Sequence, residues 1–488
     1  MLDIVIINVP GTISQHPPAA PALLKASVVS AGYSCKTIDF NIRFYKTIKK
    51  ELLNDLESYF STGLNQEFAE SANNLIKEWA EEIIQLQPKY VGISVFTYQN
   101  RTATELFCKY LKAHSNVKII VGGQGLADGG ILGGQGFAKK LLKDNLIDFY
   151  IKSEGERSLV ELLNGNLSYY GINSEEFDQI TDLSLLPLPD YSDYNLSDYS
   201  IFALPVTASR GCVRACTFCD IHEHWKYKYR SGDSVAKEII TLHKLHGVNH
   251  FLFTDSLVNG NLKEFKIFCK ILSEYNKLSD TKIKWSGQYI VHNMRHLNET
   301  YWENLAGAGA DRLAIGVETG SDSVRLHMKK KFSNVDLDHT VSMLEKYNIT
   351  CVFLMIVGYP TETEQDFNDT LTMFTRYSHL AQKIIIDIAI GSTLGILPGT
   401  PLYKHAADYR IELDKHENNW IALDNISLTL TERLLRIKRL KKHLKEQGYY
   451  FNDDGDNIIK IIENNLPIFE KRNNIKKMIQ IKKDTNNG

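Results

Sequence analysis

The sequence predicts an α/β protein in which two parallel sheets follow one another along the chain, with a helical extension behind them. Three observations predict this class. Short β-branched runs alternate with helical stretches in the first third of the chain, the same alternation resumes in its middle, and a proline-containing stretch separates the two. At 488 residues the chain is long enough for two or three domains.

The composition is that of an ordinary globular protein, with 43% hydrophobic residues, 23% charged residues and a formal net charge of -2. This balance gives no overall attraction to nucleic acid or to an anionic membrane. The beginning of the chain lacks the pattern of a signal peptide, and no apolar run is long enough to cross a bilayer. Seven cysteines, three of them clustered, favour a reducing compartment, so we expect a cytoplasmic protein.

The first domain, expected over residues 1–164, alternates strands with helices. Its predicted strands lie at 4–9, 36–40, 90–95 and 117–121. Predicted helices lie at 19–31 and 103–114, and a long amphipathic region spans 44–86. This alternation predicts a Rossmann-like, doubly wound parallel sheet.

The carboxyl ends of these strands form the edge at which doubly wound sheets bind their ligands. Residues Ser94, Thr97, Gly122, Gly123 and Gln124 fall on that edge. Because glycine lacks a Cβ, this loop lets the backbone approach a flat or anionic ligand closely. An ordinary tight turn is the alternative explanation for the glycines.

Residues 165–200 break the alternation and form the predicted interdomain linker. The segment Leu186-Pro187-Leu188-Pro189 favours a stiff, extended connection. The apolar and tyrosine content of the linker predicts that it packs against the domain that follows.

A second series of strand–helix units is expected over 201–405. Its six predicted strands lie at 205–208, 251–255, 283–288, 313–318, 352–358 and 384–390. In a parallel barrel, reactive side chains stand at the carboxyl ends of strands, where this chain has Asp255, Gln288 and Glu318. A strand-end Asp can also cap the next helix, so a structural role for Asp255 stays open.

Residues 406–488 form the expected helical extension, which ends in a frayed tail. The stretch 431–447 predicts a basic amphipathic helix with leucine and isoleucine at helical spacing. Its Lys and Arg face suits an anionic partner such as RNA or a phosphorylated metabolite. A docking helix with a solvated basic face is the interpretation that we favour over an anionic partner.

Three of the cysteines, Cys212, Cys216 and Cys219, lie close together on a loop that follows a predicted strand. Thiolates at such short spacings hold iron–sulfur clusters, and three of them leave one iron of a cubane open to a substrate or cofactor. A tetrahedral zinc site that includes His222 and His224 is an alternative, as is inert core packing. The other cysteines, in predicted strands and helices, are interpreted as core residues.

The Cys-x3-Cys-x2-Cys spacing resembles the signature of the radical SAM superfamily. The resemblance implies a partial (β/α)6 barrel of the TIM type and a [4Fe-4S] cluster that reductively cleaves S-adenosylmethionine to a 5′-deoxyadenosyl radical. Segment 316–320 resembles the fourth-strand motif of the family, whose acidic residue contacts the ribose or amino group, and 358–360 resembles the segment near the adenine. Taken alone, Thr361 and Glu364 have the spacing of a helix-starting capping box. The residues expected to contact S-adenosylmethionine are Phe218, Asp255, Gln288, Glu318 and Gly358.

The first domain is similar to the cobalamin-binding domain that precedes the barrel in a large radical SAM subfamily. Segments Gly92-Ile93-Ser94, Val121-Gly122-Gly123 and Glu154-Gly155-Glu156 carry the similarity. The similarity implies that five residues of the carboxyl edge bind cobalamin: Ser94, Thr97, Gly122, Gly123 and Gln124. The cobalt-ligating motif Asp-x-His-x-x-Gly is missing from residues 1–160, so cobalamin would bind without that histidine, or the domain is a relic.

The leading hypothesis is therefore a cobalamin-dependent radical SAM methyltransferase that receives electrons from a donor such as flavodoxin or ferredoxin. A radical SAM oxidoreductase or rearrangement enzyme without functional cobalamin is the alternative. A methylthiotransferase would need three N-terminal cysteines, and only Cys35 and Cys108 precede Cys212. The alternative outside enzymes is a zinc-stabilised binding protein. The substrate and the catalytic residues stay unassigned, a membrane partner is not expected, and nucleic acid is not favoured.

Overall fold

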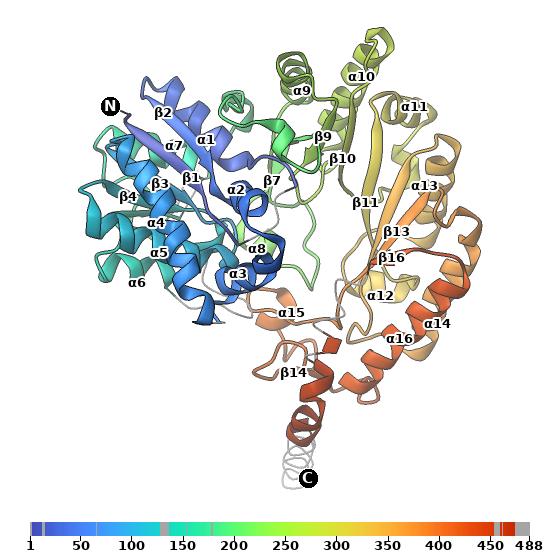
Figure 1. Cartoon of the computed structure of the whole chain (residues 1–488). Coiled ribbons are helices and arrows are strands. Elements are labelled where there is room, and N and C mark those ends of the chain that lie inside the picture. Colours follow the sequence, from blue (N-terminus) through green and yellow to red (C-terminus); the bar gives the residue numbers. More distant parts are fainter. Residues whose placement is uncertain are drawn as a thin grey trace. The chain divides into compact units, whose positions relative to one another are not determined.

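The computed structural model describes residues 2–11, 15–64, 66–126, 136–152, 154–176, 179–452, 459–460 and 462–473, and the predicted frayed tail lies outside these ranges. The chain divides into two compact units (Figure 1). The first comprises residues 1–206 and 241–252, and the second comprises 207–240 and 253–488. The segment expected to be a linker thus belongs to the first unit.

The first unit contains a five-stranded parallel sheet in the order β2-β1-β3-β4-β5. In this register Asn8 lies opposite Asp39 and Ser94, and Ser94 lies opposite Gly122, so these residues share the carboxyl edge. The four predicted strands are confirmed, and the three-residue β5 is an addition. The strands are β1 (Ile4–Asn8), β2 (Cys35–Asp39), β3 (Tyr90–Ser94), β4 (Lys118–Gly122) and β5 (Phe149–Ile151).

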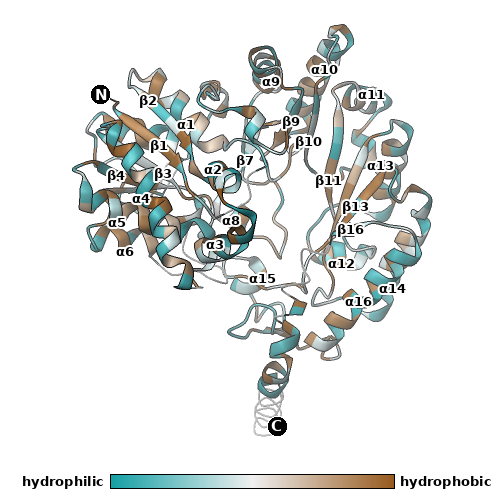
Figure 2. Cartoon of the chain, viewed as in Figure 1, coloured by the Kyte–Doolittle hydropathy of each residue, from teal (hydrophilic) through white to brown (hydrophobic). Residues whose placement is uncertain are grey.

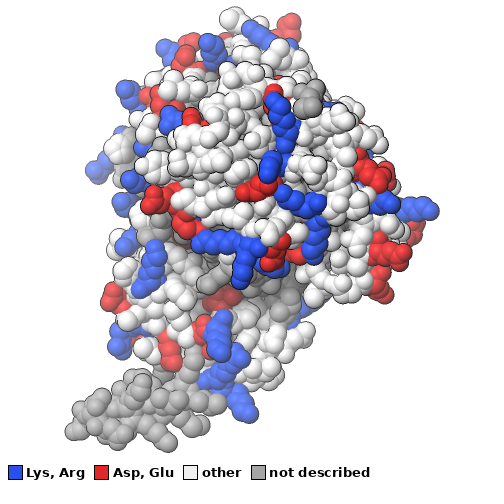
Figure 3. Space-filling view, turned by 90° about the vertical axis from the view of Figure 1, so that its left-hand side faces the viewer, with Lys and Arg blue, Asp and Glu red and all other residues white. Residues whose placement is uncertain are grey.

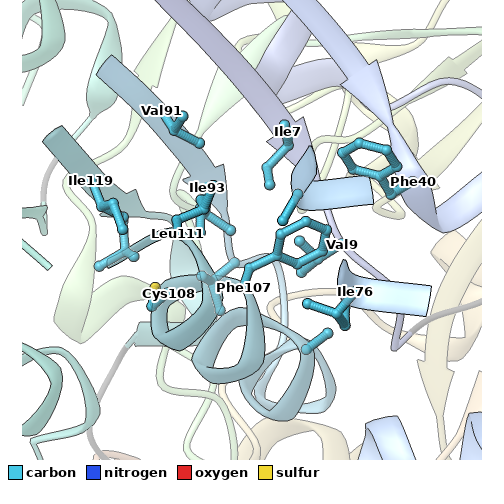
Figure 4. Close-up of a cluster of buried hydrophobic side chains, with 14 of the residues drawn as sticks. Ile7, Val9, Phe40, Ile76, Val91, Ile93, Phe107, Cys108, Leu111 and Ile119 are labelled. Carbon is cyan, nitrogen blue, oxygen red and sulfur yellow. The ribbon is translucent and has the colours of Figure 1, made fainter. Parts of the chain in front are cut away.

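Helices cover both faces of this sheet, as a doubly wound fold requires. On one face, strand residues such as Ile7, Ile93 and Ile119 pack against Phe107 and Leu111 of α5 (Figure 4). On the other face, α1 and α7 cover a second apolar cluster. The helices are α1 (Ala19–Ser30), α2 (Phe40–Thr47), α3 (Lys50–Thr62), α4 (Ala69–Gln85), α5 (Arg101–His114), α6 (Phe137–Lys143) and α7 (Gly155–Leu163).

The segment 165–200, which was predicted to be a linker, contacts the first sheet through polar side chains. Lys25 forms ion pairs with Asp190 (3.2 Å) and Asp193 (2.7 Å). Asp193 also accepts a hydrogen bond from the backbone N–H of Thr37 on the edge strand β2 (2.8 Å), and the Tyr199 hydroxyl donates to buried Asp39 (2.8 Å). These contacts make the stretch part of the first unit.

A seven-stranded sheet has the order β16-β13-β12-β11-β10-β9-β6. All six predicted strands are present in it, although 204–206 and 250–252 are counted above with the first unit. The seventh, β16, comes from the C-terminal extension and pairs in parallel with β13. The strands are β6 (Leu204–Val206), β9 (His250–Phe253), β10 (Lys284–Tyr289), β11 (Ala310–Glu318), β12 (Thr350–Met355), β13 (Ile385–Ile390) and β16 (Phe451–Asn452).

Side chains alternate along β11, since Leu313, Ile315 and Val317 are buried whereas Ala314 and Gly316 are half-buried. Figure 1 shows α11, α13 and α14 along the outer side of the curved sheet, and Figure 2 shows its apolar strands beside helices with hydrophilic outer faces. The helices are α8 (Ile221–His224), α9 (Gly232–His246), α10 (Leu262–Leu278), α11 (Glu299–Gly307), α12 (Asp322–His327), α13 (Asn334–Lys346), α14 (Glu364–Arg376), α15 (Pro401–Lys404) and α16 (Leu430–Glu446). Two further pairs of short strands are antiparallel. They are β7 (Ser209–Arg210) with β8 (Lys228–Tyr229), and β14 (Ile411–Glu412) with β15 (Ile421–Ala422).

Two expectations about helices need correction or refinement. The capping box of α14 is formed by Thr363 and Asp366, not by Thr361 and Glu364, because the helix begins at Glu364, whose carboxylate pairs with Arg439. The basic helix α16 is a docking helix that packs on α14, with the side chains of Arg433 and Arg436 buried.

Surface charge follows the near-neutral composition. Acidic and basic side chains are interspersed on the face shown in Figure 3. In the described ranges no helix combines the length and apolar character needed to cross a membrane.

Candidate functional site

The three clustered cysteines lie on the loop between β7 and α8 in the second unit. The loop begins at Gly211, whose φ of 77° and close approach to the carbonyls of Trp225 and Lys226 leave no space for a side chain. The backbone N–H of Arg214 donates to the Cys212 sulfur (3.4 Å). Burial raises the pKa of all three thiols, that of Cys216 to about 11, so they favour the neutral form until a cation binds.

One side of this loop is anchored by Asp255. Its two carboxyl oxygens accept hydrogen bonds from the Ala208 backbone N–H (2.9 Å) and the Ser209 hydroxyl (2.6 Å). Burial raises the pKa of Asp255 to about 7. The carboxyl therefore holds the strand that leads into the cysteine loop, and its expected contact with a cofactor stays a prediction.

The other side of the loop is held through Thr217. Its hydroxyl shares a hydrogen bond with buried Tyr359 (2.7 Å), whose hydroxyl is also 2.9 Å from Nδ1 of His327. The Thr217 backbone N–H donates to Met328 and its carbonyl accepts from Leu402. Sequence reasoning missed Tyr359 and His327, although a tyrosine inside the 358–360 motif was a visible signal.

Glu318 and Lys330 form a buried ion pair beside the cysteines. Lys330 Nζ lies 2.6 Å from Glu318 Oε1, and the two side chains are 11% and 9% exposed. The ammonium lies 5.7 Å from the centre of the Phe218 ring. Although burial disfavours its charge, Glu318 and Cys216 keep the pKa of Lys330 above its usual value. The positive charge of Lys330 in turn offsets part of the rise that burial causes in the pKa of all three cysteines.

Lys330 was not predicted, because it stands in a run of three lysines with nothing in the sequence to distinguish it. The structure separates them: Lys329 and Lys331 are exposed, whereas Lys330 points to Glu318. Gly316 makes this possible, since a Cβ there would lie 2.6 Å from the Glu318 carboxylate and 2.7 Å from Lys330 Nζ. The structure thus brings Phe218 and Glu318 together with the cysteines.

The remaining expected contacts of S-adenosylmethionine lie on neighbouring strand ends. Gln288 is exposed near the end of β10, next to buried Tyr289. Gly358 has a φ of 76°, and a Cβ there would lie 2.4 Å from Arg433 of α16. The Gly358 N–H donates to Glu362 (2.9 Å), which also accepts from Arg436 (2.9 Å).

The carboxyl edge of the first unit gathers the residues expected to bind cobalamin. A Cβ on Gly123 would lie 2.5 Å from the Val95 carbonyl oxygen, so the loops after β3 and β4 touch directly. Thr97 and Asn100 form a capping box, and Gln124 is exposed. Gly123 therefore has a structural role, whereas a Cβ on Gly122 would make only ordinary contacts. Two aromatic side chains on the same loop, Phe96 and Tyr98, are 64% and 46% exposed.

Within the described residues, no three His, Cys, Asp or Glu side chains converge on a single metal position. A tetrahedral zinc site needs its ligands within about 2.3 Å of one ion, whereas the thiolates of a cubane bind different irons. The His224 side chain, which the zinc alternative requires, lies outside the described part of the chain.

A cavity of about 290 Å³ lies in the C-terminal extension, among Trp420, Leu430 and Phe469. It contains none of the residues expected to bind a cofactor, so we do not place the candidate site there.

Residues 206–374, which include the cysteine loop and Glu318, match the model of the Radical SAM superfamily. The chain carries a radical SAM domain. The matched region contains the three cysteines, Phe218 and Lys330, and the resemblance seen in the motifs is thereby confirmed.

Two relatives in sequence extend the comparison. The anaerobic magnesium-protoporphyrin IX monomethyl ester cyclase of Synechocystis sp. is 24% identical over 270 residues, 51% of this chain and 53% of that protein. The chain thus spans about half the length of that relative. A Pyrococcus horikoshii protein named as an uncharacterized methyltransferase is 22% identical over 370 residues, 71% of this chain and 75% of that protein.

Two solved structures share the fold. The radical S-adenosylmethionine methyltransferase TsrM from Kitasatospora setae, with cobalamin and a [4Fe-4S] cluster bound, superposes with a TM-score of 0.60 at 14% identity over 86% of this chain and 78% of TsrM. The cobalamin-dependent S-adenosylmethionine radical enzyme OxsB, with aqua-cobalamin bound, has a TM-score of 0.61 at 18% identity over 84% of this chain and 61% of OxsB. The predicted α/β architecture, a doubly wound sheet before a radical SAM barrel, is therefore confirmed.

Proposed function

We propose that this chain is a radical SAM enzyme in which Cys212, Cys216 and Cys219 hold a [4Fe-4S] cluster. The observation that carries the proposal is the buried Lys330–Glu318 pair, which lies against these cysteines and the Phe218 ring inside the matched domain. Three thiols on one loop are the donor set that a cubane with one open iron requires. A cluster held by these cysteines would supply the electron for reductive cleavage of S-adenosylmethionine to methionine and a 5′-deoxyadenosyl radical.

The chain's own residues bind and orient this cofactor. Phe218 offers an aromatic face to the adenine, and the Glu318 carboxylate accepts hydrogen bonds from a ribose hydroxyl or the amino group. Lys330 pairs with Glu318 and places a positive charge close to all three thiols. Gly358 contributes backbone, while Asp255 and Gln288 remain expected contacts at the neighbouring strand ends.

We further propose that the first unit binds cobalamin and that the reaction is a methyl transfer, the chemistry cobalamin supplies. The names of TsrM and of the Pyrococcus relative, and the cobalamin bound in TsrM and OxsB, support this. In this chain the support is the exposed aromatic pair Phe96 and Tyr98, beside Ser94 at the carboxyl edge of the sheet. Exposed apolar rings at a ligand edge suit a flat macrocycle.

A second candidate is a radical SAM oxidoreductase or rearrangement enzyme without cobalamin. The relative named as a cyclase supports only a reaction other than methyl transfer. Both candidates need a low-potential one-electron donor, for which flavodoxin or ferredoxin is proposed.

Anaerobic reconstitution with iron, sulfide and hydroxocobalamin, followed by desalting, separates these candidates. Cluster absorption with stoichiometric cobalamin, and release of S-adenosylhomocysteine during turnover, are expected for the methyltransferase. Cluster absorption and 5′-deoxyadenosine without retained cobalamin would instead support the second candidate. A colourless protein that retains zinc would contradict both.

A further inference from the structure

The cysteine loop contains a cation that pairs with no carboxylate among the described residues. Arg214 stands between Cys212 and Cys216 and is half-buried. Its Nε atom is inaccessible to solvent and has no hydrogen-bond partner among the described residues. No ion pair to its guanidinium occurs in the described ranges either.

Two buried cations of the same domain are balanced by carboxylates. Lys330 pairs with Glu318, and Arg230 pairs with Glu238 at 2.7 Å. The ionisable groups near Arg214 that favour its charge are Cys212 and Cys216, two of the proposed cluster ligands, and no described carboxylate is among them. Arg214 therefore lies beside the proposed ligands of the cluster.

An unbalanced charge that is partly removed from water is costly, and proteins retain one where an opposite charge is expected. The [4Fe-4S] group supplies it. Three thiolates on a cubane core of charge 2+ give a net charge of -1, and a one-electron reduction makes it -2. A fixed positive charge nearby therefore stabilises the reduced form more than the oxidised form.

We propose that Arg214 is the counter-charge of the cluster and raises its reduction potential, so that an external one-electron donor can reduce it. This rests on the proposed function. Arg214 acts through the electrostatic field at the cluster and takes no part in the bonds that change. Its backbone N–H, which donates to the Cys212 sulfur, adds to the same effect because it too stabilises negative charge on the ligand.

The test is a redox titration of the reconstituted cluster in the absence of S-adenosylmethionine. Electron paramagnetic resonance monitors the fraction of reduced cluster at each potential. Arg214→Gln should shift the equilibrium between reduced and oxidised cluster about tenfold toward the oxidised form, which is about 59 mV for a one-electron couple. Arg214→Lys should retain most of the wild-type potential. Arg312→Gln is the matched control, because Arg312 lies near the start of β11, about 20 Å along the strand from Glu318.

Each outcome decides the proposal. A lowered potential in Arg214→Gln with intact cluster content, and not in the Lys and Arg312 variants, supports it. An unchanged reduction potential in Arg214→Gln overturns the proposal. This holds also if the variant loses only affinity for S-adenosylmethionine, which would make Arg214 a residue that binds the carboxylate of that cofactor. If Arg214→Gln and Arg214→Met both fail to take up a cluster while Arg214→Lys does, the arginine is required for assembly and the proposal is wrong. A wild-type protein without a cluster would contradict the proposed function itself.

Discussion

Glu318 and Lys330 show how a single pair of residues shapes the site. The Lys330 ammonium is desolvated on one side by Phe218 and held by Glu318 on the other, in space left by Gly316. Neither partner can lose the other without leaving a buried, uncompensated charge. The pair is therefore a feature whose energetics can be measured in the protein without its cofactors.

Lys330→Met should lower the free energy of unfolding by about 3 kcal/mol, because it leaves the Glu318 carboxylate buried and unpaired. The double variant Lys330→Met with Glu318→Leu should recover most of this loss. Urea unfolding of the three proteins provides the measurement. Lys329→Met, which changes the exposed neighbour, should stay within about 0.5 kcal/mol of wild type. Equal effects of Lys329→Met and Lys330→Met would contradict a buried pair.

Asp255 should make stability depend on pH. Burial raises its folded-state pKa from 3.8 to about 7, so the folded protein binds the proton more tightly than the unfolded chain. The stability from this group is complete below about pH 4 and is lost as pH rises toward 7. The difference in unfolding free energy between wild type and Asp255→Asn should fall by about 4 kcal/mol over that range. If the unfolding free energies of wild type and Asp255→Asn, measured in urea, changed in parallel with pH, Asp255 would be ionised in the folded protein over this range.

At the scale of the elements, the α16 helix links the C-terminal extension to the cofactor loop. Arg436 donates to Glu362, and Glu362 accepts from the Gly358 N–H, so the helix fixes the loop expected beside the adenine. The aliphatic part of the Arg433 side chain fills the space over Gly358, while its guanidinium stacks 3.7 Å from the centre of the Trp420 ring. The extension thus contacts the loop that is expected beside the adenine.

Arg436→Met should therefore raise the dissociation constant for S-adenosylmethionine by about tenfold, the equivalent of about 1.4 kcal/mol, with cluster content unchanged. Equilibrium dialysis against labelled S-adenosylmethionine measures it. Arg439→Met is the matched control, since Arg439 lies on the same helix but pairs with half-exposed Glu364. A similar loss of affinity in both variants would indicate general loosening of α16 rather than a defined support.

The sequence was sufficient to predict the long elements, because each carries an apolar run or a helical repeat that its packing then uses. It was insufficient for β5 and β16, whose three and two residues are too short for a periodic signal. The amphipathic spacing predicted the α16 helix but did not reveal that Arg433 and Arg436 would be buried. Phe218 and Glu318 were found through motifs, whereas Lys330 and Arg214 depend on what each side chain faces in three dimensions.

At the scale of the whole molecule, the chain carries two units with separate cores, and the account assigns a different cofactor to each. The two assignments can fail independently, since the cysteines belong to one unit and the exposed aromatic loop to the other. The similarity to TsrM and OxsB extends over both units but establishes only the fold.

Phe96→Ser with Tyr98→Ser should reduce cobalamin retention after reconstitution and desalting at least fivefold, because an exposed apolar contact is removed from the ligand edge. Iron and sulfide content should not change. Leu167→Ser, which removes another exposed apolar side chain from the same unit, serves as the control. Full cobalamin retention in the double variant would place the ligand elsewhere or exclude it.

The most direct test of the central claim compares anaerobically reconstituted wild type with a variant in which Cys212, Cys216 and Cys219 are replaced by Ala. The account predicts about four irons per wild-type chain, brown cluster absorption, and 5′-deoxyadenosine when S-adenosylmethionine and a reductant are added. The variant should keep the circular dichroism spectrum of the folded wild type. It should lose the bound iron, the cluster absorption and the formation of 5′-deoxyadenosine. If the variant retained the cluster, or the wild type folded without one and never cleaved S-adenosylmethionine, the account would be wrong.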